Sequence, residues 1–146
     1  LDMCMRILQV EGVDPLAVTN DGTTVLMMLC RYRPPNTGSL FQKLFLLLVS
    51  RGIDPFLCNN DGLSAAHFAA ASGCIPALLL LGHAGVNFGA PVEAGSSHNA
   101  SRVEQPAPLA VAAQCGHADA LLLMLKKLCS IGHEVDLDAL ISLASV

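Results

Sequence analysis

The sequence predicts an all-α protein made of short helix pairs that stack side by side. The Asn-Asp-Gly turn at residues 20–22 returns 40 residues later at residues 60–62. Gly12 returns as Gly52 at the same spacing, so two independent landmarks agree on one repeat. Hydrophobic residues make up 53% of the chain and charged residues only 14%, as expected for units that bury a face against each neighbour. These observations favour a solenoid, that is, a linear stack of helical units.

The first two units follow from these landmarks. Residues 1–18 form a partial unit, because apolar residues recur at helical spacing over residues 1–10 and a Gly-Val-Asp-Pro segment follows. The second unit covers residues 19–58. Its second helix spans residues 40–50, whose large apolar side chains share one face: Phe41, Leu44, Phe45, Leu48 and Val49.

The third unit, residues 59–91, is the most regular. Ser64 stands where a helix N-cap is needed, and the alanines of residues 65–71 form a thin helix that neighbours can approach closely. Gly73 ends this helix, as glycine does past a helix C-terminus. The second helix lies within residues 76–85, with proline in its first turn and glycine closing it.

The fourth unit is expected over residues 102–135. Residues 107–113 form its first helix and residues 121–129 its second, which is longer than in the third unit or leaves by an irregular exit. Apolar residues near the C-terminus predict a further partial unit over residues 136–146.

The third and fourth units resemble the ankyrin repeat, whose signature is Thr-Pro-Leu-His-x-Ala in a period of about 33 residues. Residues 64–70 read Ser-Ala-Ala-His-Phe-Ala-Ala, with Gly73 and Gly85 at the family's glycine positions. Residues 107–113 read Ala-Pro-Leu-Ala-Val-Ala-Ala, followed by a Gly-His pair. The resemblance implies that residues 1–146 form a single domain, a right-handed stack of about four repeats.

Two irregular loops interrupt this stack. The 40-residue spacing implies an insertion of about 7 residues against the family period, and residues 31–38 supply it between two helices. Gly116 follows Gly73 by 43 residues, and residues 88–104, rich in Gly, Ala, Ser and Asn, supply the extra length as a long mobile loop. Long loops of this kind often carry function.

The resemblance also implies where a partner binds, because ankyrin repeats use their turns and first helices. The matching positions are Asn20, Asp21, Thr23, Arg31 and Tyr32 in the second unit, Asn60, Asp61, Leu63, Ala71 and Ser72 in the third, and Glu104, Pro106, Gln114 and Cys115 in the fourth. Tyr32 stands out, since an aromatic flanked by two arginines is of the type that carries interface energy. A polar loop with one aromatic covering a helix end is the alternative.

Composition excludes several classes of partner. The net charge is −4 and there is no basic block, so nucleic acid and anionic lipid are poor candidates. Residues 63–92 carry no charge, which raises the alternative of a membrane segment. Glycine, proline, serine and histidine punctuate this run, and they favour soluble helix pairs without membrane insertion.

Metal and catalytic sites are not expected. The chain has five histidines and six cysteines, but none follow the paired spacing of structural zinc sites. The resemblance implies that His67 and His117 bond to backbone in a neighbouring turn, and Cys115 with His117 are neighbours in sequence only. We expect no metal and no cofactor, and reduced, buried cysteines in a cytoplasmic protein.

The resulting interpretation is a protein–protein interaction scaffold that binds a partner protein or peptide and is not an enzyme. Further repeats or domains of the same chain are also candidate partners. The alternative is a substrate-recruiting or regulatory segment of a larger enzyme, such as a ligase, kinase or acyltransferase. An enzyme in its own right would need converging titratable groups, which the sequence does not offer.

Overall fold

A computed structural model describes residues 6, 12, 14–31, 38–89 and 106–131. The described chain is all-α, and its helices are α2 (Val25–Arg31), α3 (Gly38–Ser50), α4 (Ala65–Ser72), α5 (Ile75–His83), α6 (Pro108–Gln114) and α7 (Ala118–Ile131). The predicted helix at residues 1–10, the unit at 136–146 and nearly all of the 88–104 loop lie outside the described residues, as do Tyr32 and Glu104.

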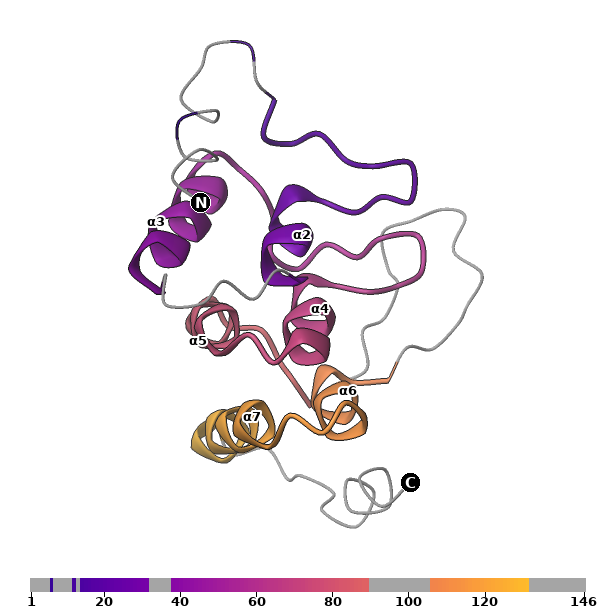
Figure 1. Cartoon of the computed structure of the whole chain (residues 1–146), viewed down its shortest axis with the longest axis vertical. Coiled ribbons are helices and arrows are strands. Elements are labelled where there is room, and N and C mark those ends of the chain that lie inside the picture. Colours follow the sequence, from indigo (N-terminus) through magenta and orange to yellow (C-terminus); the bar gives the residue numbers. More distant parts are fainter. Residues whose placement is uncertain (1–5, 7–11, 13, 32–37, 90–105, 132–146) are drawn as a thin grey trace.

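The helices form two rows (Figure 1). The inner row consists of α2, α4 and α6, with α4 packed between the other two. The outer row consists of α3, α5 and α7, with α5 in the middle. Since α4 packs on α5 and α6 on α7, the chain builds successive helix pairs, each adding one helix to each row.

A hairpin precedes both α2 and α4, and the two hairpins project from the same side of the inner row (Figure 1). Single antiparallel bridges join Val18 to Thr24 and Cys58 to Ser64. Gly22 and Gly62 close the turns at φ of 78° and 77°, a backbone conformation that costs glycine little and other residues more. The predicted Asn-Asp-Gly turns are therefore where the sequence places them.

Small residues make α4 thin enough to pack on both sides. Ala66, Ala69 and Ala70 are each no more than 1% exposed, because α2 and α6 approach from opposite directions. Ser64 is the N-cap, as predicted, and forms a capping box with His67. Gly73 ends the helix at φ 65° and ψ 30°, the left-handed conformation expected there.

The core runs between the two rows of helices. Its largest fully buried side chains include Phe41, Leu48, Leu78, Leu81, Phe88, Met124 and Leu128, and each such burial contributes about 1.5–3 kcal/mol. Phe88 stands at the start of the predicted loop, yet it is 1% exposed. Its carbonyl accepts a hydrogen bond from the Leu109 N–H at 3.0 Å, so this residue ties the start of that segment to α6.

The helix ends differ modestly from expectation. The last outer helix, α7, begins at Ala118 rather than at residue 121. It is longer than its counterpart α5, which confirms the prediction of a longer helix over that of an irregular exit.

No helix in the described ranges is long and apolar enough to cross a bilayer.

The cysteines match expectation only in part. Cys30 and Cys74 are buried, as predicted. Cys115 and Cys129 are exposed, so the expectation of burial is wrong for these two.

Candidate functional site

The described surface is hollowed where the hairpins meet the inner helices, and we call this region the inner groove. Two adjoining hollows of about 340 and 530 Å³ form it. The first is lined by Thr19, Asp21, Thr23, Met27, Met28, Arg31, Asn59, Asp61, Leu63 and Phe68. The second is lined by Arg31, Leu63, His67, Phe68, Ala71, Ser72 and Val111. Because they share Arg31, Leu63 and Phe68, the two hollows form one continuous surface.

A row of apolar side chains crosses the groove. Met28 lies in α2, Phe68 in α4 and Val111 in α6. They are 40 and 43 residues apart, which are the spacings of the turn and helix-end glycines, so they occupy the same place in three successive helices. Met28 is 52% exposed, and the other two are half-buried. The row is therefore accessible to a ligand.

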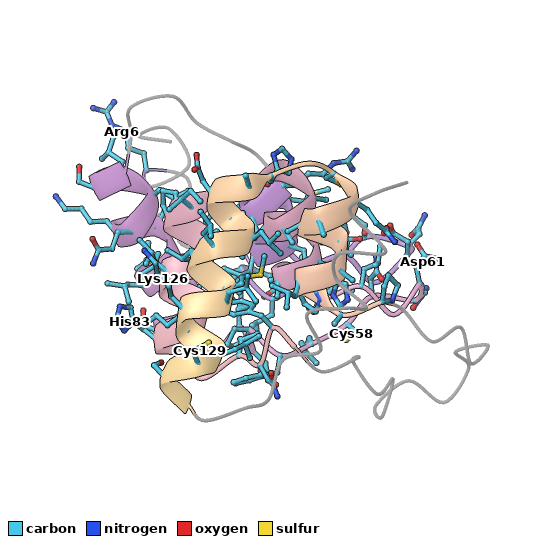
Figure 2. All side chains as sticks on the ribbon, turned by 90° about the horizontal axis from the view of Figure 1, so that it is seen from below. Arg6, Cys58, Asp61, His83, Lys126 and Cys129 are labelled. Carbon is cyan, nitrogen blue, oxygen red and sulfur yellow. The ribbon has the colours of Figure 1, made fainter. Side chains whose placement is uncertain are left out.

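Charges of opposite sign lie along the groove. Arg31 ends α2 and lines both hollows. Within the described chain its guanidinium has no ion-pair or hydrogen-bond partner. Asp21 and Asp61 line the hairpin end, and Figure 2 shows Asp61 at the hairpin edge of the molecule. A ligand would thus meet a cation beside the apolar row and carboxylates at the hairpins.

The two hairpin carboxylates differ in their surroundings. The hydroxyls of Thr19 and Thr23 both donate to Asp21, the latter to Oδ2 at 2.9 Å. These hydrogen bonds hold the pKa of Asp21 below its usual value, because they favour the charged form. Asn59 occupies the position of Thr19 in the next hairpin, and its Oδ1 accepts the N–H groups of Asp61 and Leu63 at 3.1 and 2.9 Å. Asp21 is therefore a preorganised acceptor.

Histidines fix the inner helices to one another. Nδ1 of His67 accepts the Ser64 backbone N–H at 3.1 Å, so the proton resides on Nε2, which donates to the Pro106 carbonyl at 2.9 Å. His117 reaches back from the next unit, with Nε2 2.9 Å from the Ala71 carbonyl. Both imidazoles bond to backbone of a neighbouring unit, as the sequence predicted.

Polar bonds also align the two hairpins. The Asn60 backbone N–H donates to the Asp21 carbonyl at 2.8 Å, and its side-chain amide donates to the Asn20 carbonyl at 3.3 Å. Ser72 Oγ donates to the Cys30 carbonyl at 2.9 Å, which joins α4 to α2. The groove is thus held by bonds between units and does not depend on a ligand for its shape.

The structure brings together about half of the predicted partner-binding residues. Those that line the groove are Asp21, Thr23, Arg31, Asp61, Leu63, Ala71 and Ser72. Asn20 and Asn60 lie exposed at the hairpin tips, and Pro106, Gln114 and Cys115 are exposed in the fourth unit outside the groove. Thr23 is only 8% exposed, so its hydroxyl mainly supports the hairpin.

Sequence reasoning missed the apolar row. Met28, Phe68 and Val111 are hydrophobic residues inside helices, which by default suggests the core. The signal that could have found them is their repetition, since a hydrophobic residue stands at the same repeat position in three successive helices. No group of three or more potential metal ligands exists among the described residues.

Comparison with known proteins gives one partial similarity. Over 86 residues this chain is 34% identical to the B-cell lymphoma 3 protein homolog of Mus musculus. The match covers 59% of this chain and 18% of the mouse protein, so the chain spans less than a fifth of that protein's length. No family model matches the chain.

Proposed function

We propose that this chain binds a partner protein or peptide through the inner groove. The observation that carries the proposal is the apolar row of Met28, Phe68 and Val111, which is accessible within a continuous hollow. Arg31, which has no ion-pair partner among the described residues, lies beside it, and aromatic residues, methionine and arginine are the types enriched at protein interfaces. A peptide with an apolar side chain over Phe68 and a carboxylate near Arg31 would satisfy both features.

The stack is proposed to be of the ankyrin type. Three facts support this: a hairpin followed by a helix pair, the recurring glycines, and histidines that bond between units. The partial similarity to the mouse protein is consistent with it. We further propose that the chain is not an enzyme and acts in the cytoplasm, where exposed thiols such as Cys115 stay reduced.

Groove variants with matched controls test the binding role. The immobilised 146-residue chain is compared with Phe68→Ser and Arg31→Glu in capturing proteins from native extract. Phe56→Ser and Arg51→Glu make the same changes at exposed positions outside the groove. We expect crosslinking and mass spectrometry to find partners that both groove variants lose and both controls keep.

The size of the loss also matters. Loss of a central interface residue typically costs 2 kcal/mol or more, which is a decrease of about 30-fold in affinity. Partners captured equally by all five proteins would rule out the groove as the binding surface. A partner lost by the controls but kept by the groove variants would place the site near Phe56 and Arg51, outside the groove.

A further inference from the structure

The outer row of helices carries a second set of equivalent apolar residues. Leu46 in α3, Leu79 in α5 and Leu122 in α7 are 53%, 38% and 55% exposed. They are 33 and 43 residues apart, which are the spacings of Gly52 to Gly85 and of α5 to α7. The same solvent-facing position is therefore leucine in each described outer helix.

A second row lies directly beside the first. Leu47, Leu80 and Leu123 follow the exposed leucines by one residue and are half-buried. Leu80 and Leu123 pack against the core, whereas the exposed leucines do not belong to it. Core packing thus accounts for Leu80 and Leu123, whereas Leu46, Leu79 and Leu122 have no core contact within the described part of the chain. We call the two rows together the outer leucine face.

Cations outnumber carboxylates around this face, and we call these cations its basic border. Lys126 and Lys127 follow Leu122, whereas Lys43 and the carboxylate Asp119 each precede an exposed leucine by three residues. The outer helices contain Lys43, Lys126 and Lys127 against a single carboxylate, Asp119, although the whole chain has a net charge of −4. Lys126 lies one turn after Leu122, and Figure 2 shows it near His83, on the side away from Asp61. No ion pair neutralises these lysines within the described ranges.

Gly82 in α5 leaves room for the side chain of Lys127. A Cβ on Gly82 would lie 3.5 Å from Cε of Lys127, so the lysine stem crosses from α7 over α5. Stems of this kind cover apolar surface while the ammonium group stays in water. Lys127 therefore extends the positive charge of α7 toward α5.

The spacing of the face suits a helical ligand. Packed helices lie about 8–10 Å apart, which sets the distance between successive leucines of the exposed row. A helix crossing the row advances about 10.5 Å in seven residues, so apolar residues at a heptad repeat would meet Leu46, Leu79 and Leu122 in turn. Acidic residues beside that stripe would meet the lysines.

We propose that the outer leucine face docks an acidic amphipathic helix of a partner protein. Charge complementarity selects this occupant over a second copy of the chain, since two copies would bring their basic borders together. The inner groove lies on the other row of helices (Figure 1), so both surfaces can be occupied at once. The chain would then connect two partners.

The test uses a synthetic probe. A fluorescein-labelled peptide of about 18 residues, with leucine at heptad a and d positions and glutamate at e and g, is titrated against the whole chain by anisotropy. A second peptide carries lysine in place of glutamate. We expect saturable binding of the acidic peptide and at least about tenfold weaker binding of the basic one, a difference of about 1.4 kcal/mol.

Variants locate the binding. Leu46→Gln, Leu79→Gln and Leu122→Gln combined should weaken acidic-peptide binding at least about tenfold through lost apolar burial. Leu16→Gln with Leu57→Gln is the matched control, because these leucines are 52% and 39% exposed but lie outside the helices. Lys43→Glu with Lys126→Glu should reverse the preference between the two peptides. Circular dichroism of each variant tests whether it is folded.

Four results would overturn the proposal. The first is equal binding by the triple variant and its control. The second is loss of peptide binding in Phe68→Ser, which would place the peptide in the inner groove. The third is binding to vesicles rich in phosphatidylserine with no binding to the acidic peptide. The fourth is a concentration-dependent dimer in sedimentation that the triple variant abolishes.

Discussion

His67 uses both nitrogens of its ring to hold two units together, and it does so as a neutral imidazole. Burial lowers its pKa below the usual 6.5, because the interior disfavours the charged form. Nδ1 is needed as an acceptor for the Ser64 N–H, so protonation would also break the capping box. The neutral state is thus part of the fold.

This gives a pH dependence whose sign is fixed. Near pH 6.5 and below, the unfolded chain binds a proton at this histidine that the folded chain does not, so the free energy of unfolding falls as the pH is lowered. We expect wild type to lose stability to urea between about pH 7 and pH 5, and His67→Gln to lose less over that range. His83→Gln, at an exposed position, is the control. A profile identical in wild type and His67→Gln would refute the role of His67.

Gly73 makes a second prediction at the residue scale. Its φ is +65°, and a Cβ there would lie 2.8 Å from Nδ1 of His117. Gly116 is its counterpart at φ +75° with nothing within 4 Å. Both changes to alanine impose a backbone cost of roughly 1–2 kcal/mol, but Gly73→Ala also displaces the ring that bonds to Ala71. We expect thermal unfolding to show the larger loss for Gly73→Ala.

A double-mutant cycle separates the two contributions. His117→Ala removes the obstructing ring, so Gly73→Ala should cost less in that background than in wild type. If the losses in free energy of unfolding of the two single variants simply add in the double variant, the close approach of Gly73 to His117 does not affect stability.

At the scale of elements, α4 depends on its alanines because it has neighbours on both sides. Ala69 is fully buried, whereas Ala71 is exposed on the same helix. Ala69→Leu inserts three carbons between α4 and its neighbours and should cost about 1–3 kcal/mol or more. Ala71→Leu should change the urea midpoint little, since surface changes are usually within about 0.5 kcal/mol. Equal effects would mean that α4 is not tightly packed.

The hairpin turns and the two ends of α4 were predictable because local chemistry sets them. Gly22, Gly62 and Gly73 need positive φ, and Ser64 suits an N-cap, so each could be recognised from a few neighbouring residues. The start of α7 and the burial of Phe88 depend on contacts between units. Such contacts leave no local signature, and for that reason the sequence did not reveal them.

For the molecule as a whole, the candidate site was only partly predictable for the same reason. The resemblance predicted Arg31, Asp61 and Leu63 as partner-binding residues, and all three line the groove. The resemblance could not tell which helix residues remain exposed after stacking, and so it missed Met28 and Phe68. Exposure in a stack is decided by the neighbouring unit, whose distance along the chain varies here between 33 and 43 residues.

A stack of this kind should be most protected at its centre. The inner helix α4 is covered by α2 and α6, and the outer helix α5 by α3 and α7. In repeat proteins each unit contacts only its neighbours, so stability depends on how many interfaces a unit makes. We expect hydrogen exchange measured by mass spectrometry to be slowest in α4 and α5 and faster in α2 and α7.

Two core variants sharpen this expectation. Leu78→Ala in α5 and Leu128→Ala in α7 remove similar buried side chains and should each cost about 2–5 kcal/mol locally. Because α5 lies between two neighbours, Leu78→Ala should speed exchange in all described helices. Leu128→Ala should speed it chiefly in α6 and α7. Uniform protection in wild type, with both variants accelerating every helix equally, would show that the described units unfold as one cooperative body.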